Sequence, residues 1–152
     1  MQSVTVIGID PGSQRTGCGV VRTSSAGKEF SDRLARIYHE LSGVLARLKP
    51  EEAAIEQVFT AKNAASALKL GQARGVAVAA CAAHGLTISD YEPTLVKKSL
   101  VGTGRAEKEQ VAFMVQRLLN VKNANWALDT SDALAVAVCH LTVRRFAALA
   151  GK

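Results

Sequence analysis

Apolar and polar positions follow two different periods along this chain. Residues 4–9 (VTVIGI) form a short β-branched run closed by DPG at residues 10–12, which predicts a strand followed by a turn. Between residues 34 and 48, apolar side chains recur every three or four positions, and Pro50 follows. This second pattern predicts an amphipathic helix that ends before the proline.

The same reading predicts the remaining elements. Further strands are expected at 17–22, 53–56 and 86–91, and helices at 63–83, after 92–94, at 106–119 and at 129–149, with a break at 102–104. The helices at 63–83 and 129–149 are so rich in apolar residues that both are expected to be largely buried. Two glycines inside the former, Gly71 and Gly75, cost ~1 kcal/mol each relative to Ala, which suggests close packing against another surface. Strands alternating with helices predict an α/β fold around a partly parallel sheet.

Composition narrows the class of protein. A chain of 152 residues with 48% hydrophobic and 21% charged residues suits one folded domain and excludes wholesale disorder. No apolar run is long enough to span a bilayer, and the N-terminus lacks a signal peptide, so we expect a soluble, cytoplasmic protein with no membrane partner. Cys18, Cys81 and Cys139 are far apart, which predicts buried free thiols and neither disulfides nor a zinc site. The net charge of +6 hints at a polyanionic partner.

Four of the thirteen acidic residues stand in apolar surroundings. Asp10 directly follows the first strand, Glu56 ends the run AAIE, and Asp129 and Asp132 open the last helix. Each has an ordinary explanation taken singly: an Asx-turn for Asp10, the N-cap for Asp129, and a favourable place in the first helical turn for Asp132. Glu56 is the hardest to explain in this way, because an unpaired glutamate at the end of a buried strand is costly.

Taken together, these four carboxylates predict a metal site. The carboxyl ends of parallel strands share one edge of the sheet, and residues three apart share a helix face. Converging carboxylates repel one another unless a cation compensates them, and oxygen ligands select Mg²⁺ or Mn²⁺. Two such ions can promote phosphodiester hydrolysis, so a basic protein with this site is a nuclease candidate.

Several longer motifs resemble one family. The opening GIDPGS with Thr16-Gly17, the block IEQVFTAKNAASALKLGQARG at residues 55–75, VKKSLVGTGRAEKEQV and DTSDALAVAVCH occur in the order typical of the RuvC family of bacterial Holliday junction resolvases. The likeness covers almost the whole chain, and the block at 55–75 makes it specific.

The resemblance implies a ribonuclease H-like fold, with a central mixed β-sheet flanked by helices. It implies a Mg²⁺-dependent endonuclease, with Mn²⁺ as a substitute and two ions per site, that resolves four-way DNA junctions in recombination and repair. The catalytic and metal-binding carboxylates it implies are Asp10, Glu56, Asp129 and Asp132. It further implies a homodimer formed through the helix at 64–83 and, as partners, junction DNA and the RuvA and RuvB branch-migration proteins.

Residues that contact DNA are also expected. Phe59 falls on an aromatic that the family uses at the unpaired centre of the junction, where stacking contributes ~1–3 kcal/mol per base. The basic and polar residues expected to contact phosphates are Lys62, Asn63, Lys97, Lys98, Arg105 and Lys108. Such contacts give affinity that falls with salt and carry no sequence information. Arg144 and Arg145 are expected to be solvated charges at a helix end.

One region departs from the family pattern. Relatives have a longer strand, hairpin and strand before the first helix, whereas GCGVVRTSSAGKEF compresses this region and points to a gap near residues 21–23. An intact three-stranded antiparallel start is expected to be hard to build from what remains.

Other functions remain open at this stage. Actin-like ATPases and sugar kinases share a similar opening but need two lobes, and the segment GSQRTGCG lacks the lysine of a P-loop. A RuvC-like nuclease acting on other branched DNA or on RNA, and a junction-binding module without catalysis, are the alternatives.

Overall fold

Five strands and five helices make up the described part of the chain. The structure, a computed structural model, describes residues 4–11, 15–18, 22–24, 29–57, 63–121 and 127–151, with only the backbone at 15–18 and 22–24. The elements are β1 (Val6–Asp10), β2 (Arg15–Cys18), β3 (Arg22–Ser24), α1 (Phe30–Leu48), β4 (Glu52–Glu56), α2 (Ala64–Ala83), β5 (Thr87–Tyr91), α3 (Pro93–Val101), α4 (Lys108–Leu118) and α5 (Leu128–Leu149). Their order is the one predicted from the apolar pattern, except that two short strands replace the single strand expected at 17–22.

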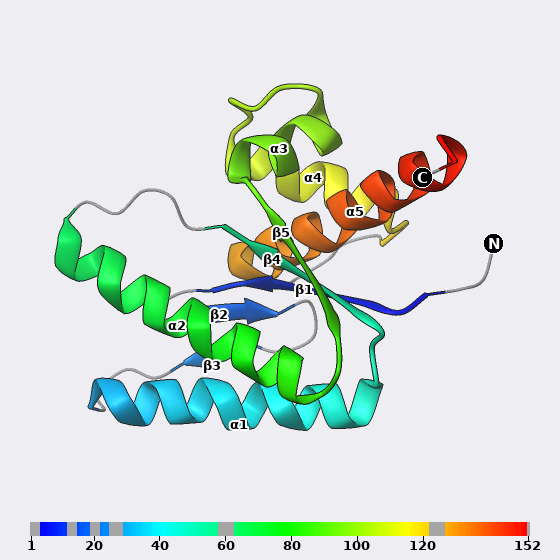
Figure 1. Ribbon diagram of the computed structural model, residues 1–152. Coiled ribbons are helices and arrows are strands. Elements are labelled where there is room, and N and C mark those ends of the chain that lie inside the picture. Colours follow the sequence, from blue (N-terminus) through cyan, green and yellow to red (C-terminus); the bar gives the residue numbers. More distant parts are fainter. Residues whose placement is uncertain are drawn as a thin grey trace.

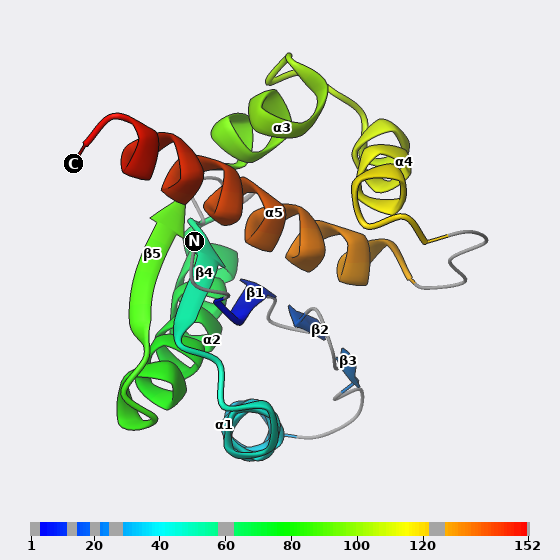
Figure 2. The same cartoon turned by 90° about the vertical axis from the view of Figure 1, so that its right-hand side faces the viewer.

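The strands form one mixed sheet in the order β3-β2-β1-β4-β5. β1, β4 and β5 run parallel, so their carboxyl ends lie at the same edge, while β2 pairs antiparallel with β1 and with β3. Helices cover both faces: α1 and α2 lie on one side and α3, α4 and α5 on the other (Figures 1 and 2). The predicted α/β fold with a central mixed sheet is confirmed.

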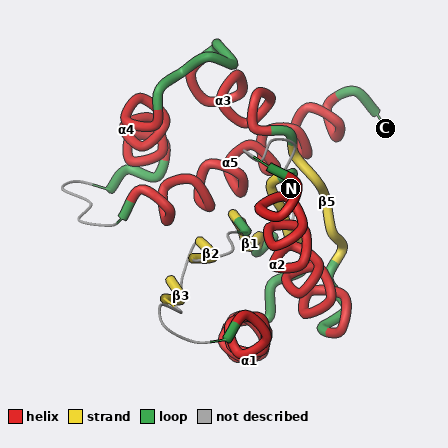
Figure 3. The backbone as a smooth tube through the Cα atoms, turned by 90° about the vertical axis from the view of Figure 1, so that its left-hand side faces the viewer, coloured by secondary structure: helices red, strands yellow, loops and turns green. Residues whose placement is uncertain are grey.

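Alternation along the strands decides which layer each side chain enters. Ile7 and Ile9 of β1 pack with the buried residues of α1 and α2, whereas Val6 packs with those of α4 and α5. β4 repeats this arrangement, with Ala53 and Ile55 facing α1 and α2. Since successive side chains of a strand point to opposite faces, the last residues of β1 and β4 belong to the face covered by α5. Figure 3 shows α5 crossing this face.

Helix α1 shows how local sequence sets an element. Its buried residues, Ile37, Leu41, Val44 and Leu45, recur at helical spacing and face the sheet. The helix ends at Lys49, which has a left-handed φ of 46° and donates its backbone N–H to the Leu45 carbonyl. This is a common way to end a helix, and it occurs immediately before Pro50, as predicted.

The short antiparallel strands correct two expectations. The segment predicted as one strand at 17–22 is divided between β2, which ends at Cys18, and β3, which begins at Arg22. The expectation that a three-stranded antiparallel start is hard to build is wrong, because β1, β2 and β3 do pair. The pairing needs only four residues in β2 and three in β3.

Two helices are less buried than expected. In α2 only Ala73, Ala77, Ala80 and Cys81 are buried, and the first half of the helix is exposed. In α5 burial ends at His140, and the following residues 141–149 are exposed or partly exposed. The prediction of largely buried helices was wrong because high apolar content does not reveal how far a helix extends beyond the sheet it covers.

Two predictions from composition can be compared with the fold. Within the described ranges, no helix is both long enough and apolar enough to cross a bilayer. Cys81 and Cys139 are buried, as expected, and the side chain of Cys18 lies outside the described residues.

Candidate active site

The carboxyl ends of β1 and β4 lie side by side in the sheet. Asp10 is the last residue of β1 and Glu56 is the last residue of β4, and the register pairs the preceding residues, Ile9 with Ile55. Both acidic side chains are half-buried. The parallel pairing therefore brings together two carboxylates that are 46 residues apart in sequence.

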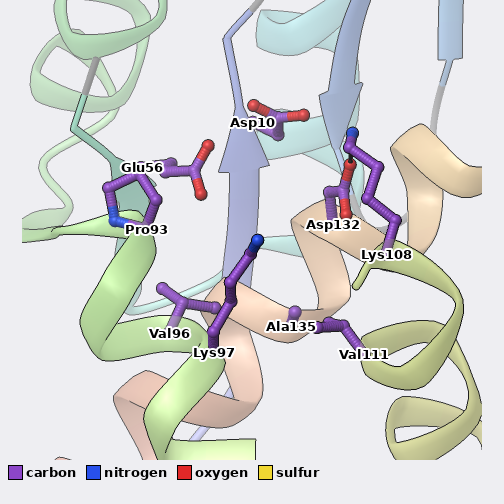
Figure 4. Close-up of a pocket in the computed structure, with 9 residues that line it drawn as sticks. All are labelled: Asp10, Glu56, Pro93, Val96, Lys97, Lys108, Val111, Asp132 and Ala135. Atoms are coloured by element: carbon purple, nitrogen blue, oxygen red, sulfur yellow. Dashed lines mark hydrogen bonds and ion pairs between the residues drawn. The ribbon is translucent and has the colours of Figure 1, made fainter. Parts of the chain in front are cut away.

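A third carboxylate comes from α5. This helix begins at Leu128 with Ala127 as its N-cap, so Asp129 lies in the first turn and the N-cap interpretation of Asp129 is wrong. Asp132, three residues further on, is half-buried and lies beside the ends of β1 and β4 (Figure 4). A carboxylate near a helix N-terminus interacts favourably with the helix dipole, which helps this position to hold a negative charge.

These side chains surround a cavity of about 280 Å³. Its apolar wall comes from α3, α4 and α5, and its polar side contains three carboxylates and two lysines (Figure 4). The lining residues are Asp10, Glu56, Pro93, Val96, Lys97, Lys108, Val111, Asp132 and Ala135. Of the four predicted carboxylates, Asp10, Glu56 and Asp132 thus face one space, while Asp129 is not part of the lining.

Burial and mutual repulsion raise the proton affinity of the carboxylates. The pKa of Asp10 rises from 3.8 to about 8, first because the group is buried and then because Glu56 and Asp132 repel its charge. The pKa of Glu56 is also raised by burial, with a further upward contribution from Asp132. A hydrogen bond between Asp10 and Glu56 lowers the pKa of Glu56 and raises that of Asp10, so this pair retains a proton at neutral pH.

Two lysines compensate part of the negative charge. Lys108 Nζ lies 2.6 Å from Asp132 Oδ2, and this hydrogen bond is the main cause of the raised pKa of Lys108. The charge of Asp129 raises the pKa of Lys108 further, which places Asp129 within electrostatic reach of the cavity. Lys97 extends from α3 into the same space and lowers the pKa of Glu56 (Figure 4).

The donor set fits a hard divalent cation. Three carboxylates border the cavity, and burial first, with repulsion from Glu56 and Asp132 second, raises the pKa of Asp10 despite the opposing charge of Lys108. In the described parts of the chain, however, no three Asp, Glu, His or Cys side chains are grouped closely enough to hold a metal ion. In this arrangement a shared proton and the Lys108 ammonium perform the compensation that a cation would provide.

Comparison with known proteins identifies the family. A sequence model of the family described as crossover junction endodeoxyribonuclease RuvC matches residues 6–140, most of the chain. The chain belongs to the RuvC family. A RuvC from Oleidesulfovibrio alaskensis is 60% identical to it over 162 aligned positions, covering 98% of this chain and 97% of that one.

Solved RuvC structures agree in fold. The structure of Thermus thermophilus RuvC superimposes with a TM-score of 0.84 at 31% identity and covers 93% of this chain and 96% of that one. A structure of T. thermophilus RuvC in complex with Holliday junction substrate gives a TM-score of 0.86, also at 31% identity, over 95% of this chain and 96% of that one. The expected ribonuclease H-like architecture of RuvC proteins is thus the observed one.

The length of the chain can be compared with that of one relative. The alignment with the O. alaskensis RuvC has 162 positions, ten more than the 152 residues of this chain. At least ten aligned positions therefore lack a residue here. This agrees with the inference that the chain is shorter than its RuvC relatives.

The residues predicted to bind DNA occupy different kinds of position in this RuvC-family chain. Lys98 and Arg105 are exposed on the α3 side, outside the cavity lining. Asn63 is exposed and also caps α2, because its Oδ1 accepts a hydrogen bond from Ser66 N at 2.9 Å. Phe59 and Lys62 lie outside the described residues. The pairing of Lys108 with Asp132 could not be predicted from sequence, because the two residues are 24 positions apart and lie on different helices.

One polar cluster was missed from the sequence. His140 Nε2 lies 2.5 Å from Glu52 Oε2, and His140 Nδ1 lies 2.8 Å from the Tyr91 hydroxyl. Arg144, expected to be solvated, lies 3.1 Å from the same Glu52. His140 is therefore a buried histidine whose two ring nitrogens both have partners. Glu52 shares a strand face with Ala54 and Glu56, and this alternation was the signal in the sequence that could have placed it near the cluster.

Proposed function

We propose that this chain is a metal-dependent endonuclease that resolves four-way DNA junctions. The observation that carries the proposal is the convergence of Asp10, Glu56 and Asp132 on one cavity in a chain of the RuvC family. The RuvC of T. thermophilus, which shares the fold, has been captured with a Holliday junction substrate. Asp129 joins this set because it lies one helical turn from Asp132 and acts on the same lysine.

The carboxylates have a clear task in this reaction. Asp10, Glu56 and Asp132, with Asp129 at the rim, would hold Mg²⁺, or Mn²⁺ in its place, two ions per site being our expectation. When bound, the ions would supply a water of lowered pKa and compensate charge on the leaving oxygen. The apolar wall formed by Val96, Val111 and Ala135 limits access of bulk water to that side of the cavity.

The two lysines that line the cavity, Lys97 and Lys108, are suited to binding a phosphate group. Lys97 and Lys108 reach into the cavity from two different helices, so a scissile phosphate there would lie between positive charges. A phosphate that draws Lys108 away from Asp132 would also free that carboxylate for a cation. Exposed Lys98 and Arg105 extend the positive surface. Phe59 is proposed to act at the unpaired centre of the junction, and Lys62 to contact phosphates.

The first test compares substrates. Purified protein is incubated with a synthetic four-way junction and with linear duplex of the same sequence, each with Mg²⁺ or with EDTA, and the products are resolved on denaturing gels. We expect paired cuts in opposite strands of the junction, only with Mg²⁺. Equal cleavage of both DNAs would contradict structure selectivity. Cleavage of neither would favour a binding module, and preferential cleavage of other branched DNA or RNA would favour the alternative nuclease.

A symmetric substrate suits a two-fold symmetric enzyme, and α2 is the proposed interface. Leu68 on this helix is 65% exposed. A Cβ added at Gly71 or Gly75 would have no described atom within 4 Å, so packing within this chain does not explain these glycines. Close approach by the same helix of a second copy does, and a C₂ dimer would place two sites for symmetric cuts. RuvA and RuvB as partners and a cytoplasmic location are further expectations for a RuvC-family chain.

The dimer proposal predicts the effect of a charge on α2. Leu68→Asp is expected to shift the protein from dimer to monomer at micromolar concentration, because the exposed leucine would be buried between copies and its replacement leaves an unpaired charge there. Sedimentation velocity measures the change. Leu149→Asp is the matched control, since Leu149 is 72% exposed on α5, away from α2. Equal behaviour of the two variants would exclude this interface.

A further inference from the structure

Helix α5 contacts β1 without room for even one methyl group. A Cβ built on Gly8 would lie 2.0 Å from the carbonyl oxygen of Ala133 and 2.9 Å from the Cβ of Ala137. The closer of these neighbours is backbone, so rotating a side chain cannot relieve the contact. The backbone of α5 at Ala133 and the methyl group of Ala137 therefore rest directly on the backbone of β1 at this residue.

On both elements, this contact is close in sequence to a proposed catalytic carboxylate. Gly8 precedes Asp10 by two residues, so both belong to the same face of β1. Ala133 directly follows Asp132 on α5. The separation between strand and helix at Gly8 therefore also sets how far Asp132 stands from Asp10.

We propose that Gly8 is a positioning residue for the metal site. Because it lacks a side chain, α5 can approach β1 closely enough for Asp132 to bind metal together with Asp10 and Glu56. The inference rests on the proposed function, since it takes these carboxylates as the metal ligands. It assigns Gly8 no contact with metal or DNA. Its effect passes through the placement of α5.

The middle of α5 is anchored, which determines how the helix would respond to a methyl group. His140 ties α5 to β4 and β5 through Glu52 and Tyr91, two turns after Asp132. Ordinary contact with a Cβ begins near 3.4 Å. The helix would therefore retreat by about 1.4 Å near Ala133, pivoting about His140. Asp129 and Asp132 lie farther from His140 along α5 than Ala133 does. Their turn would therefore move away from β1 together with Ala133.

The test is Gly8→Ala, measured by Mn²⁺ binding to the DNA-free protein with electron paramagnetic resonance. We expect affinity for Mn²⁺ to fall by about 10- to 100-fold, the range for residues that orient metal ligands. The Mg²⁺ concentration that half-activates junction cleavage should rise in parallel, while junction binding in EDTA stays as in wild type. Leu45→Ala is the control: Leu45 is 2% exposed on α1, across the sheet, so the variant loses stability without moving α5.

A second variant keeps the proposal testable if Gly8→Ala does not fold. Ala137→Val adds bulk to the same contact from the helix side and is expected to weaken Mn²⁺ binding in the same direction, by a smaller factor. Wild-type Mn²⁺ affinity in the folded variants, or an equal loss in Leu45→Ala, would overturn the positioning role. If the wild-type protein itself binds no Mn²⁺, the proposed metal site fails first, which is a distinct result.

Discussion

Asp10→Asn is expected to abolish junction cleavage and, at the same time, to stabilise the metal-free protein above neutral pH. Loss of cleavage, by roughly 10³-fold or more, follows from removing a charged group that would hold the cation stabilising the reacting phosphate. The gain in stability follows from the surroundings of Asp10: burial, Glu56 and Asp132 all oppose its negative charge. A neutral amide of similar size avoids that cost.

The pH dependence has a definite sign. The pKa of Asp10 is raised from 3.8 to about 8 in the folded state, so the folded protein binds this proton more tightly than the unfolded chain does. Stability contributed by the proton is complete below about pH 4 and is lost as the pH rises toward 8. The free energy of unfolding of the wild type in EDTA should therefore fall across this window. Asp10→Asn should show a smaller decline, as measured by urea denaturation at a series of pH values.

Mg²⁺ gives an independent check of the same group. Because a cation would bind the ionised carboxylates of the folded state, added Mg²⁺ should stabilise the wild type at pH 8 and have little effect on Asp10→Asn. Asp90→Asn is a suitable control, since Asp90 pairs with Arg74 at 2.6 Å outside the cavity. A variant at Asp10 that still cuts at the wild-type rate would contradict the metal assignment. A variant that shows the wild-type pH slope would contradict the electrostatic account.

His140→Ala is expected to lower the free energy of unfolding by about 2–4 kcal/mol. His140 is 6% exposed and bridges three elements, because its ring nitrogens contact Glu52 of β4 and Tyr91 of β5. Since a carboxylate only accepts hydrogen bonds, Nε2 donates to Glu52, and Nδ1 shares a hydrogen bond with the Tyr91 hydroxyl. Removing the ring leaves both partners unsatisfied and opens a cavity under α5.

Urea denaturation at pH 7 measures this loss, with Arg144→Ala as the matched control. Arg144 contacts the same Glu52 at 3.1 Å, but its side chain is 46% exposed. An exposed ion pair contributes at most about 1 kcal/mol, so the control should lose far less stability. A double-mutant cycle between His140→Ala and Glu52→Gln isolates the coupling between the two groups. Equal losses of unfolding free energy in His140→Ala and Arg144→Ala would show that the buried His140–Glu52 contact stabilises the protein no more than the exposed Arg144–Glu52 ion pair does.

Local pattern was enough to locate most elements and to select the acidic residues of the cavity. Asp10 and Glu56 were recognisable because each ends a short apolar run, and Asp132 because it opens an apolar helix. Burial along α2 and α5 was misjudged for a physical reason. Composition reports how apolar a helix is, while exposure depends on how far the helix extends past its neighbours, as residues 141–149 do.

The sequence by itself determined the periodicity of each element, the acid at the end of each parallel strand and the motifs that place the chain in the RuvC family. These are properties of residues close together in the chain. Only the tertiary structure decided that Lys108 pairs with Asp132, that Asp10 and Glu56 are close enough to raise the pKa of Asp10, and that α5 rests on the backbone of Gly8. Each of these depends on separations of a few ångströms between distant segments, which are set by packing across the sheet and by no local preference.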